Sequence, residues 1–365
     1  MNILMLSTDS NILKEGSAVR VRMAEYGQLF DNLYIILLSS GPTQKQKISE
    51  NVHIYSINSD NKIKASVKAV NSSKYFKDID VVSSQNPFEL GVIGYVISKK
   101  LKAKFHVQIH TDFLNENFSR FSLRNAFSVG ISKIVLPRAK GIRVVSERIK
   151  RSLFKVNINC EPVVLPILVD REKLITNVKI DLRKKYPEFE TLVLTVSRLE
   201  KEKDIETLLK GFNQVINFYP KTALVIIGSG YELDNLKRLV KDLGIEDKVK
   251  FEGYQEDIYS YMKTADIYAQ SSMYEGYGMT LVEAALLRLP IVSTRVGIVG
   301  DVLKAGQGAL TCEVSDSECM GKNIVKLIED KELRNSIYME ALKEINEHVI
   351  SKEEYMERYK NSLHI

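Results

Sequence analysis

The sequence contains little cysteine, no tryptophan and no long apolar run. Its three cysteines, Cys160, Cys312 and Cys319, form no Cys-x-x-Cys pair and are odd in number, which favours a reducing compartment over a disulfide scaffold. No stretch approaches the roughly 18 consecutive apolar residues of a membrane-spanning helix. The first residues, Met-Asn-Ile-Leu-Met-Leu, form an apolar run too short for a secretory signal and have no basic start. We therefore expect a cytoplasmic protein.

Composition excludes several other classes. Hydrophobic residues make up 44% of the chain and charged residues 27%, which excludes a long disordered chain and a fibrous repeat. The 365 residues are enough for about two domains. Lys plus Arg number 52 and Asp plus Glu 46, and the resulting net charge of +6 is too small to indicate a nucleic-acid or membrane partner by itself.

Short apolar, β-branched runs alternate with longer amphipathic runs along most of the chain. The runs that predict strands are 3–6, 33–38, 79–82, 105–109 and 142–145, and then 192–196, 224–227, 249–251, 267–269 and 291–292. Segments 18–30, 88–101 and 145–154 have helical patterns, as does the polar stretch 352–362. Nearly continuous apolar strands separated by helices predict an α/β fold with doubly wound parallel sheets.

This alternation of strand and helix patterns is interrupted once, at a segment that contains Pro162 and Pro166. Two prolines so close together favour an extended linker. We therefore predict an N-terminal domain over residues 1–168 and a C-terminal domain over 169–349. The last helix, about 350–365, is expected to pack back on the first domain. In doubly wound sheets, ligands bind outside the carboxyl ends of the strands, so we expect a ligand site in a cleft between the domains.

The sharpest local feature is a glycine-rich turn after the predicted strand 267–269. Helix N-termini behind glycines bind anions such as phosphate. Glu275 precedes the helix, which is expected to begin near Thr280, and Glu283 lies about one turn inside it. Carboxylates beside a phosphate site are suited to accept hydrogen bonds from ribose or sugar hydroxyls. For Glu283 alone, an ordinary helix-start acid is an equally good interpretation.

A second feature follows the predicted strand 192–196. Arg198 and Lys203 lie five residues apart in a strand-end loop, where two cations can be placed over one anion. The planar fork of Arg and the point charge of Lys together suit a diphosphate. Taken alone, such a run is more often a solvated charged turn.

Together these two features resemble the retaining glycosyltransferases of family 4. The family's E-x7-E pattern appears as Glu275 and Glu283, and its Arg-Leu-x-x-x-Lys pattern as Arg198, Leu199 and Lys203. The resemblance implies the GT-B fold, in which two Rossmann-like domains face each other across a cleft. One departure is Asp204, where the family usually has glycine.

The resemblance also implies roles for residues. Glu283 would bind ribose hydroxyls, Glu275 a hydroxyl of the donor sugar, and Arg198 with Lys203 the diphosphate leaving group. The nucleotide base would lie near 251–254, which includes Tyr254. The backbone groups expected to contact sugar and phosphate belong to Gly276, Tyr277, Gly278, Met279 and Thr280.

Two candidates lie in the first half of the chain. Gly16 stands between the first predicted strand and its helix, where the family has a glycine loop that approaches donor and acceptor; a plain helix start capped by Ser17 is the alternative. His110 ends the predicted strand 105–109, and in the family a histidine here reaches the donor sugar. A lone histidine is otherwise more often structural, but a strand-end position favours function.

The net charge hides an asymmetry. Residues 1–166 contain 24 Lys plus Arg and 13 Asp plus Glu, a net +11, whereas the remainder has 28 and 33, a net −5. Segment 117–139 interleaves Phe118, Phe121, Leu123, Phe127, Ile131, Ile134 and Val135 with Arg120, Arg124, Lys133 and Arg138. This pattern fits docking on an anionic membrane or, equally, a helix packed on its own sheet. Without a recognition motif, nucleic acid explains it less well.

We therefore predict a retaining glycosyltransferase that moves a hexosyl or N-acetylhexosaminyl group from a UDP- or GDP-linked sugar to a glycan or lipid-linked acceptor. Cell-surface polysaccharide or glycolipid synthesis is the expected setting, with peripheral contact at the inner face of the cytoplasmic membrane. The resemblance implies no cofactor and no essential metal. The alternatives are an epimerase or a phosphorylase on the same fold, or a nucleotide-sugar binding protein without catalysis.

Overall fold

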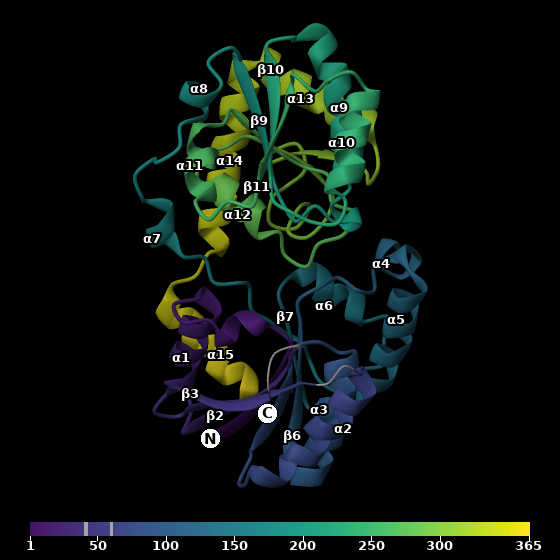
Figure 1. Ribbon diagram of the computed structural model, residues 1–365, viewed down its shortest axis with the longest axis vertical. Helices are drawn as coiled ribbons and strands as arrows, with labels where there is room; N and C mark the ends of the chain where they lie inside the picture. The colour runs from purple at the N-terminus through teal and green to yellow at the C-terminus, as the bar shows by residue number, and fades with distance from the viewer. Residues whose placement is uncertain (40–42, 59–60) are drawn as a thin grey trace. The chain divides into compact units, whose positions relative to one another are not determined.

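The computed structural model describes residues 1–39, 43–58 and 61–365 (Figure 1). The chain divides into two compact units. Unit 1 comprises Met1–Pro166 and Ile350–Ile365, and unit 2 comprises Ile167–Val349. Each unit is an α/β body built on one largely or wholly parallel sheet, which confirms the predicted fold class.

The sheet of unit 1 has the strand order β3-β4-β2-β1-β5-β6-β7-β8. Its strands are β1 Asn2–Ser7, β2 Asn32–Leu38, β3 Gln44–Ser49, β4 Val52–Ile57, β5 Val81–Ser84, β6 Lys104–Ile109, β7 Gly141–Val144 and β8 Val163–Val164. All pair in parallel except β3, which is antiparallel to β4. The central strand β1 sets the register, with Ile3 opposite Leu33 on one side and Val81 on the other.

Helices cover both faces of this sheet (Figure 1). They are α1 Ala18–Gly27, α2 Lys62–Ser72, α3 Glu89–Leu101, α4 Glu116–Phe121, α5 Leu123–Val135, α6 Glu147–Leu153 and α15 Lys352–Leu363. On one face α2 and α3 bury Ala69, Ile93 and Ile97 against Leu4 and Val82 of the strands. On the other face lie α1 and the C-terminal helix α15.

The helix α15 is part of the core of unit 1. The ring of Tyr359 stacks on that of Tyr26 in α1, with 4.1 Å between centroids, and the Tyr26 and Tyr355 hydroxyls are 2.9 Å apart. Buried Arg143, on β7, donates to Gln108 Oε1 at 2.8 Å and to the Tyr355 hydroxyl at 3.1 Å. Residues from the two ends of the chain therefore complete one hydrophobic and polar interior.

The sheet of unit 2 is parallel throughout, with the strand order β11-β10-β9-β12-β13-β14. Its strands are β9 Thr191–Val196, β10 Thr222–Ile227, β11 Val249–Gly253, β12 Ile267–Gln270, β13 Ile291–Thr294 and β14 Leu310–Cys312. Its helices are α7 Arg171–Leu174, α8 Leu182–Lys185, α9 Ile205–Phe218, α10 Leu233–Asp242, α11 Ile258–Thr264, α12 Met279–Leu286, α13 Ser317–Glu329 and α14 Lys331–His348.

The core of unit 2 explains this arrangement. Phe212 of α9, Val240 of α10 and Met320 of α13 pack with Leu224 and Ile226 of the sheet in one buried cluster. Helices α11, α12 and α14 cover the opposite face (Figure 1). In the described part of the chain, no helix is long and apolar enough to cross a bilayer.

The structure corrects the expectation for cysteine. Cys312, at the end of β14, and Cys319, in the first turns of α13, form a disulfide with 5.7 Å between their Cα atoms, whereas Cys160 is free. The absence of a Cys-x-x-Cys pair did not exclude this bond. A strand end and the following helix bring together two cysteines that are seven positions apart in the chain. The sequence favoured a reducing compartment over a disulfide scaffold, and that expectation did not include this disulfide.

Candidate active site

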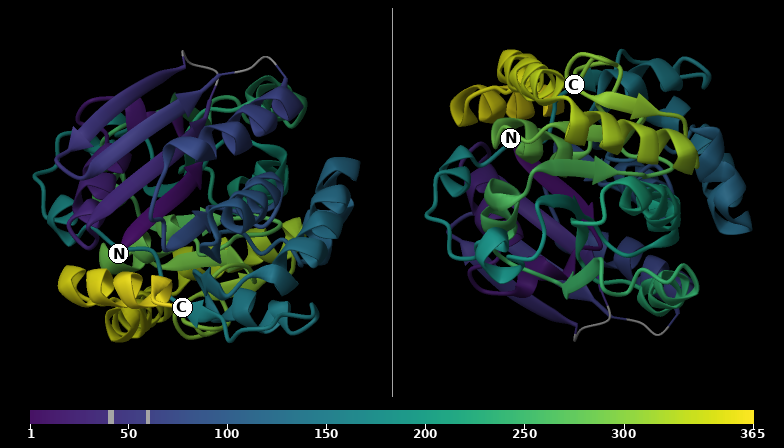
Figure 2. Two further views of the ribbon diagram at one scale, coloured as in Figure 1. Left: turned by 90° about the horizontal axis from the view of Figure 1, so that it is seen from below. Right: turned by 90° about the horizontal axis from the view of Figure 1, so that it is seen from above.

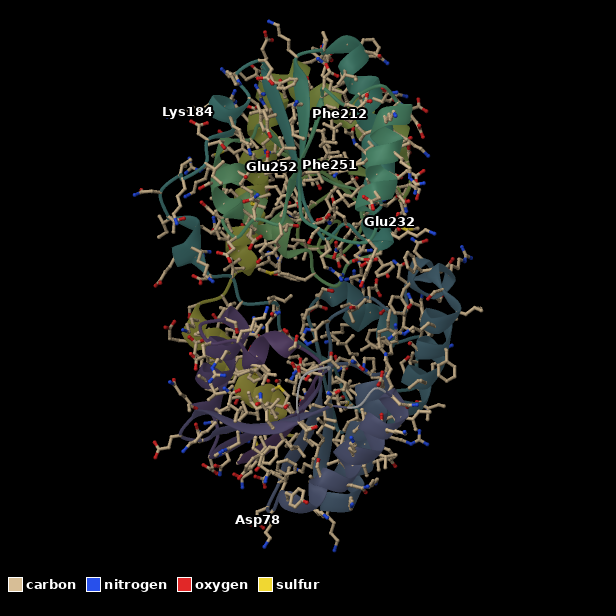
Figure 3. All side chains as sticks on the ribbon, viewed as in Figure 1. Asp78, Lys184, Phe212, Glu232, Phe251 and Glu252 are labelled. Carbon is tan, nitrogen blue, oxygen red and sulfur yellow. A yellow bond between two sulfur atoms is a disulfide. The ribbon has the colours of Figure 1, made fainter. Side chains whose placement is uncertain are left out.

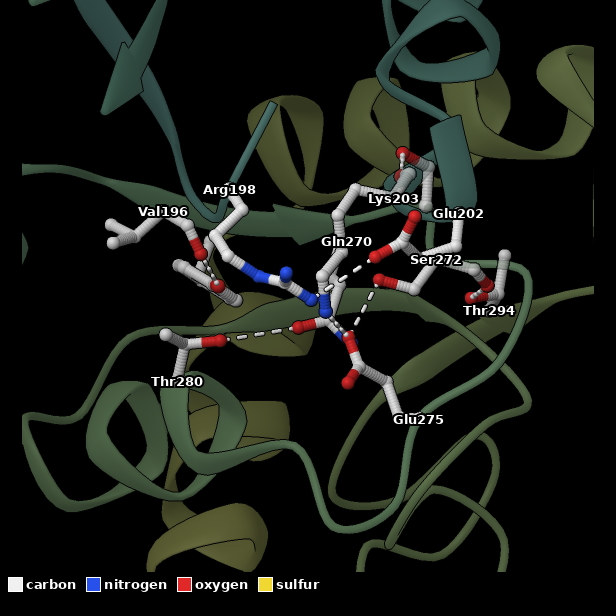
Figure 4. Close-up of polar contacts among 11 residues, drawn as sticks. Val196, Arg198, Glu202, Lys203, Gln270, Ser272, Glu275, Thr280 and Thr294 are labelled. Carbon is white, nitrogen blue, oxygen red and sulfur yellow. Dashed lines mark hydrogen bonds and ion pairs between the residues drawn. The ribbon is translucent and has the colours of Figure 1, made fainter. Parts of the chain in front are cut away.

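The site in unit 2 is built at the carboxyl ends of two neighbouring strands. Strands β9 and β12 pair in parallel, with Val193 opposite Ile267, so the loops that follow them leave the same edge of the sheet. Arg198 and Lys203 lie in the first loop, and Glu275 lies in the second. The two segments that carried the sequence prediction therefore meet in space (Figure 4).

Lys203 and Glu275 form the centre of the site. Lys203 Nζ lies 2.5 Å from Glu275 Oε1, and the side chains are only 14% and 15% exposed. The Ser272 hydroxyl donates to the same carboxylate oxygen at 2.8 Å. A largely buried ion pair of this kind fixes both side chains, since either charge alone would be costly to desolvate.

The backbone of the two loops is also cross-linked. The Met273 N–H donates to the Glu202 carbonyl at 2.8 Å, and the Ser271 hydroxyl donates to the Lys203 carbonyl at 3.0 Å. These bonds hold the loop that contains Glu275 against the loop that contains Lys203, so the ion pair sits on a fixed framework.

Arg198 is placed differently. Its side chain is 71% exposed, and its Nη2 lies 3.1 Å from Glu202 Oε1. Figure 4 draws this contact between the Arg198 guanidinium and the Glu202 carboxylate as a dashed line. The loop after β9 therefore carries one largely buried cation, Lys203, and one exposed cation, Arg198.

Two glycines allow the Arg198 loop to lie close to the next loop of the sheet. A Cβ added at Gly228 would meet the Ser197 carbonyl oxygen at 1.8 Å, and one added at Gly230 would meet the Leu199 carbonyl oxygen at 2.2 Å. These glycines therefore serve backbone packing behind the site.

The backbone conformation at Asp204 explains why aspartate can replace the glycine of the family pattern. It has a left-handed backbone, with φ of 48°, immediately before α9. Glycine is favoured in that region, and aspartate is among the few other residues that tolerate it. The Asp204 carboxylate accepts hydrogen bonds from the hydroxyls of Thr207 at 2.8 Å and Ser315 at 2.9 Å, which anchors the end of the Lys203 loop.

The glycine-rich turn begins helix α12. Gly278 has a φ of 95° and precedes Met279, the first helical residue, so the free N–H groups of the first turn belong to the residues predicted to contact phosphate. The Tyr277 carbonyl accepts from Ile298 N–H at 2.9 Å. A Cβ added at Gly297 would come within 2.3 Å of this carbonyl oxygen, so Gly297 permits the turn.

Glu283 lies inside α12 and has a partner that sequence reasoning missed. The Tyr259 hydroxyl, from α11, donates to Glu283 Oε1 at 3.0 Å. Burial raises the pKa of Glu283 to about 6, although the Tyr259 hydrogen bond and the charge of Lys173 oppose this shift. An aromatic residue 24 positions earlier, in another helix, leaves no spacing signal that could have linked the two.

Tyr254 follows β11, the strand at one edge of the unit 2 sheet. Its side chain is 73% exposed in the loop after β11. The preceding Glu252, labelled in Figure 3, accepts hydrogen bonds from Lys185, Tyr186 and Tyr261. Burial alone would raise the pKa of Glu252, but these three donors lower it. Tyr254 therefore stays a prediction, as an exposed ring at the end of a strand.

Gly16 and His110 lie in unit 1, after the parallel strands β1 and β6. Gly16 has a φ of 72°, and the Ser17 hydroxyl accepts from Arg20 N–H at 3.2 Å, which is the capped helix start considered as the alternative. His110 Nε2 is 3.0 Å from Gln85 Oε1, and Gln85 follows β5. Both residues thus stand at the carboxyl edge of their own sheet. Among the residues that the structure describes, no group of three acidic, histidine or cysteine side chains could hold a metal ion.

Comparison with known proteins identifies the class. A family model described as glycosyl transferases group 1 matches residues 178–344, nearly all of unit 2. The N-acetyl-alpha-D-glucosaminyl L-malate synthase of Bacillus anthracis is 26% identical over 275 residues, which are 74% of this chain and 71% of that enzyme. The alpha-monoglucosyldiacylglycerol synthase of Streptococcus pneumoniae is 27% identical over 239 residues, 62% of this chain and 54% of that one.

A solved structure extends the likeness to both units. HepE of Anabaena, in complex with UDP-glucose, aligns over 100% of both chains with a TM-score of 0.77 and 19% sequence identity. The two α/β units and these relatives define a glycosyltransferase of the GT-B fold. The resemblance inferred from Arg198, Lys203, Glu275 and Glu283 is confirmed at this level.

Proposed function

We propose that the protein is a retaining glycosyltransferase that moves a hexosyl or N-acetylhexosaminyl group from a nucleotide sugar to a glycan or lipid-linked acceptor. The observation that carries the proposal is the Lys203–Glu275 ion pair beside the start of α12 at one sheet edge. A cation, a helix N-terminus and a carboxylate at one place suit a sugar diphosphate, which needs charge neutralisation and hydroxyl acceptors together.

The donor is proposed to carry UDP or GDP. The complex of HepE with UDP-glucose supports a nucleotide sugar. No cofactor and no essential metal are part of the proposal, since Lys203 and Arg198 would neutralise the diphosphate. Glu283, held by Tyr259, would accept the ribose hydroxyls.

The reaction would proceed on one face of the sugar. The bond between the anomeric carbon and the diphosphate oxygen breaks, and Lys203, Arg198 and the first N–H groups of α12 stabilise the charge that develops on that oxygen. The acceptor hydroxyl forms the new bond from the same face, and its proton passes to the departing phosphate. Glu275 would hold a hydroxyl of the donor sugar, and the role that the resemblance implies for His110 stays a prediction.

The setting proposed is the synthesis of cell-surface polysaccharide or glycolipid, in the cytoplasm and peripherally at the inner face of the membrane. The relative named for a glucosyldiacylglycerol product supports a lipid-linked acceptor. The net charge of +11 over residues 1–166 supports an anionic surface as the place where that acceptor is met.

The experiment begins with thermal-shift measurements against UDP-, GDP- and ADP-sugars, because a ligand that binds only the folded state raises its melting temperature. The stabilising donor is then used in a transfer assay over a panel of glycan and lipid acceptors, with the Arg198→Ala/Lys203→Ala variant as comparison. Transfer that retains the anomeric configuration and fails in the variant is expected.

Other outcomes of the same assay would overturn the proposal. Conversion of the donor sugar without an acceptor would indicate an epimerase. A requirement for inorganic phosphate would indicate a phosphorylase. Donor binding without turnover on every acceptor would indicate a binding protein, and unchanged turnover in the double variant would remove the assigned phosphate site.

A further inference from the structure

The helix α5 exposes its apolar side to solvent. Leu123, Phe127 and Ile134 are 91%, 71% and 60% exposed. At 100° per residue these three positions fall within about 40° of one another on the helix. The opposite side, which faces the protein, includes the fully buried Ser132. A helix packed only on its own sheet would have the reverse orientation, with apolar residues inward.

Basic residues frame this apolar face. Arg124 and Lys133 are exposed on α5, one on each side of the Leu123–Phe127–Ile134 face, and Arg120 and Arg138 stand just before and just after the helix. The sequence has no acidic residue between Glu116 and Glu147. Glu116 itself is already paired with Arg120, at 3.0 Å.

The neighbouring helix α3 continues the same character. It contacts α5, and its Val92 and Val96 are 43% and 42% exposed. The Arg138 guanidinium lies over the Tyr95 ring of α3, 5.6 Å from its centroid. Figure 1 and both views of Figure 2 show α5 at the periphery of unit 1.

We propose that the outer face of α5, defined by Leu123, Phe127 and Ile134 with Arg124 and Lys133 at its rim, docks on an anionic lipid surface. Leu123, Phe127 and Ile134 would enter the boundary between headgroups and acyl chains, while the bases contact lipid phosphates. This inference rests on the proposed function and deepens it. An enzyme docked on the membrane would meet a lipid-linked acceptor there.

Charge favours lipid over a second copy of the chain. A two-fold interface between copies centred on α5 would bring Arg124 and Lys133 of each chain near the same bases of the other. Such like-charge contacts oppose association, whereas a surface of anionic lipid is complementary to all of them at once.

The test is co-sedimentation of the full chain with vesicles. Vesicles of phosphatidylglycerol and phosphatidylcholine in equal parts are compared with vesicles of phosphatidylcholine alone, at low and at high salt. We expect binding to the anionic vesicles only, weakened by salt because bases near a surface are screened. The Leu123→Ser/Phe127→Ser/Ile134→Ser variant should lose this binding. The Arg124→Glu/Lys133→Glu variant should bind at least about tenfold less.

Matched variants in unit 2 serve as controls. Phe218, at the end of α9, is 74% exposed and matches Phe127, and Lys237 and Lys241 are exposed on α10. Phe218→Ser and Lys237→Glu/Lys241→Glu remove the same kind of side chain or the same charge and should bind vesicles like the parent. The shift of melting temperature with UDP, measured on every variant, separates a failure of docking from a failure of the proposed donor site.

Three results would overturn the docking proposal: equal binding to phosphatidylcholine vesicles, equal loss in the unit 2 controls, and full binding by the α5 triple variant. Sedimentation velocity tests whether the α5 face instead binds a second copy of the chain, because it reports the oligomeric state. A dimer in the parent that becomes a monomer in the triple variant would assign the face to a second copy of the chain.

Discussion

Glu275 accepts two hydrogen bonds on one carboxylate oxygen, from Lys203 Nζ at 2.5 Å and from the Ser272 hydroxyl at 2.8 Å. Lys203 and Glu275 are 72 positions apart in the chain. The carboxylate proposed to hold the donor sugar and the cation proposed to hold its diphosphate are therefore set by each other before any donor binds.

Lys203→Ala should affect both stability and catalysis. It leaves the Glu275 carboxylate, which is only 15% exposed, without its cation, and an unpaired polar group in such a place costs roughly 1–3 kcal/mol. It also removes a preorganised charge from the diphosphate, for which a loss of about 10²–10³-fold in turnover is typical. Thermal unfolding and a transfer assay measure the two effects.

Arg198→Ala is the matched comparison. The Arg198 side chain is 71% exposed and its ion pair with Glu202 lies at the surface. The free energy of unfolding should therefore change by less than about 0.5 kcal/mol, while turnover falls. Equal destabilisation by both variants would contradict the view that only Lys203 is part of the folded framework.

Glu283 should make donor binding depend on pH. Its pKa in the folded protein is raised to about 6 from 4.5, so the carboxylate is protonated as pH falls below about 6 and loses its capacity to accept two hydroxyl hydrogen bonds. UDP affinity should fall by about tenfold from neutral pH to about pH 5. Calorimetric titration of the parent and of Glu283→Gln, which should bind weakly and without this pH dependence, measures the effect.

The same group should oppose folding at neutral pH. Because the folded state raises the pKa of Glu283, the folded protein binds a proton more tightly than the unfolded chain, and stability declines as pH rises from about 4.5 to about 6. The cost above that window is at most about 2 kcal/mol. Glu283→Gln should therefore unfold at higher temperature than the parent at about pH 8; a lower temperature would contradict the raised pKa.

Gly297 and Gly244 separate backbone strain from loop displacement. Both have a left-handed φ, of 58° and 69°, but a Cβ at Gly297 would meet the Tyr277 carbonyl oxygen at 2.3 Å, whereas one at Gly244 has nothing within 4 Å. Both alanine variants should lose about 1 kcal/mol to strain. Only Gly297→Ala should also weaken UDP binding, because it displaces the turn before α12. Equal UDP affinity in the two variants would remove Gly297 from the support of the site.

The Cys312–Cys319 disulfide should contribute measurably to stability. It closes a short loop, for which chain entropy predicts roughly 2 kcal/mol. The loop includes Ser315, whose hydroxyl holds Asp204 at the end of the Lys203 loop. Reduction, or Cys312→Ser, should lower the denaturant midpoint, and Cys160→Ser should leave it unchanged under both oxidising and reducing conditions.

Much of the fold could be predicted because buried parallel strands leave a strong sequence signal. The apolar run 192–196 lies within the observed β9, and the alternation with helices gave the fold class. β3 could not be found in this way, since Gln44–Ser49 is a polar edge strand that buries none of its side chains fully. The strand predicted at 79–82 begins only at Val81, since Asp78, shortly before it, has a left-handed backbone with φ of 52°.

The candidate site divides in the same way. Arg198, Lys203, Glu275 and Glu283 could be selected because their spacing in the chain is fixed by two strand-end loops and one helix. Tyr259 could not, since its contact with Glu283 depends on how α11 packs beside α12. The disulfide and the outward apolar face of α5 are likewise consequences of packing, since the pattern of segment 117–139 fitted a membrane-facing helix and a helix packed on its own sheet equally well.

The return of the chain to unit 1 has a consequence for the order of folding during synthesis. Unit 2 is continuous in the chain, so all of its residues are made before Ile350–Ile365. Unit 1, although its first 166 residues come earlier, lacks Tyr355 and Tyr359 until the end, and Arg143 until then lacks two of its aromatic neighbours. Unit 1 is therefore translated first but completed last, and its core stays incomplete while unit 2 is being made.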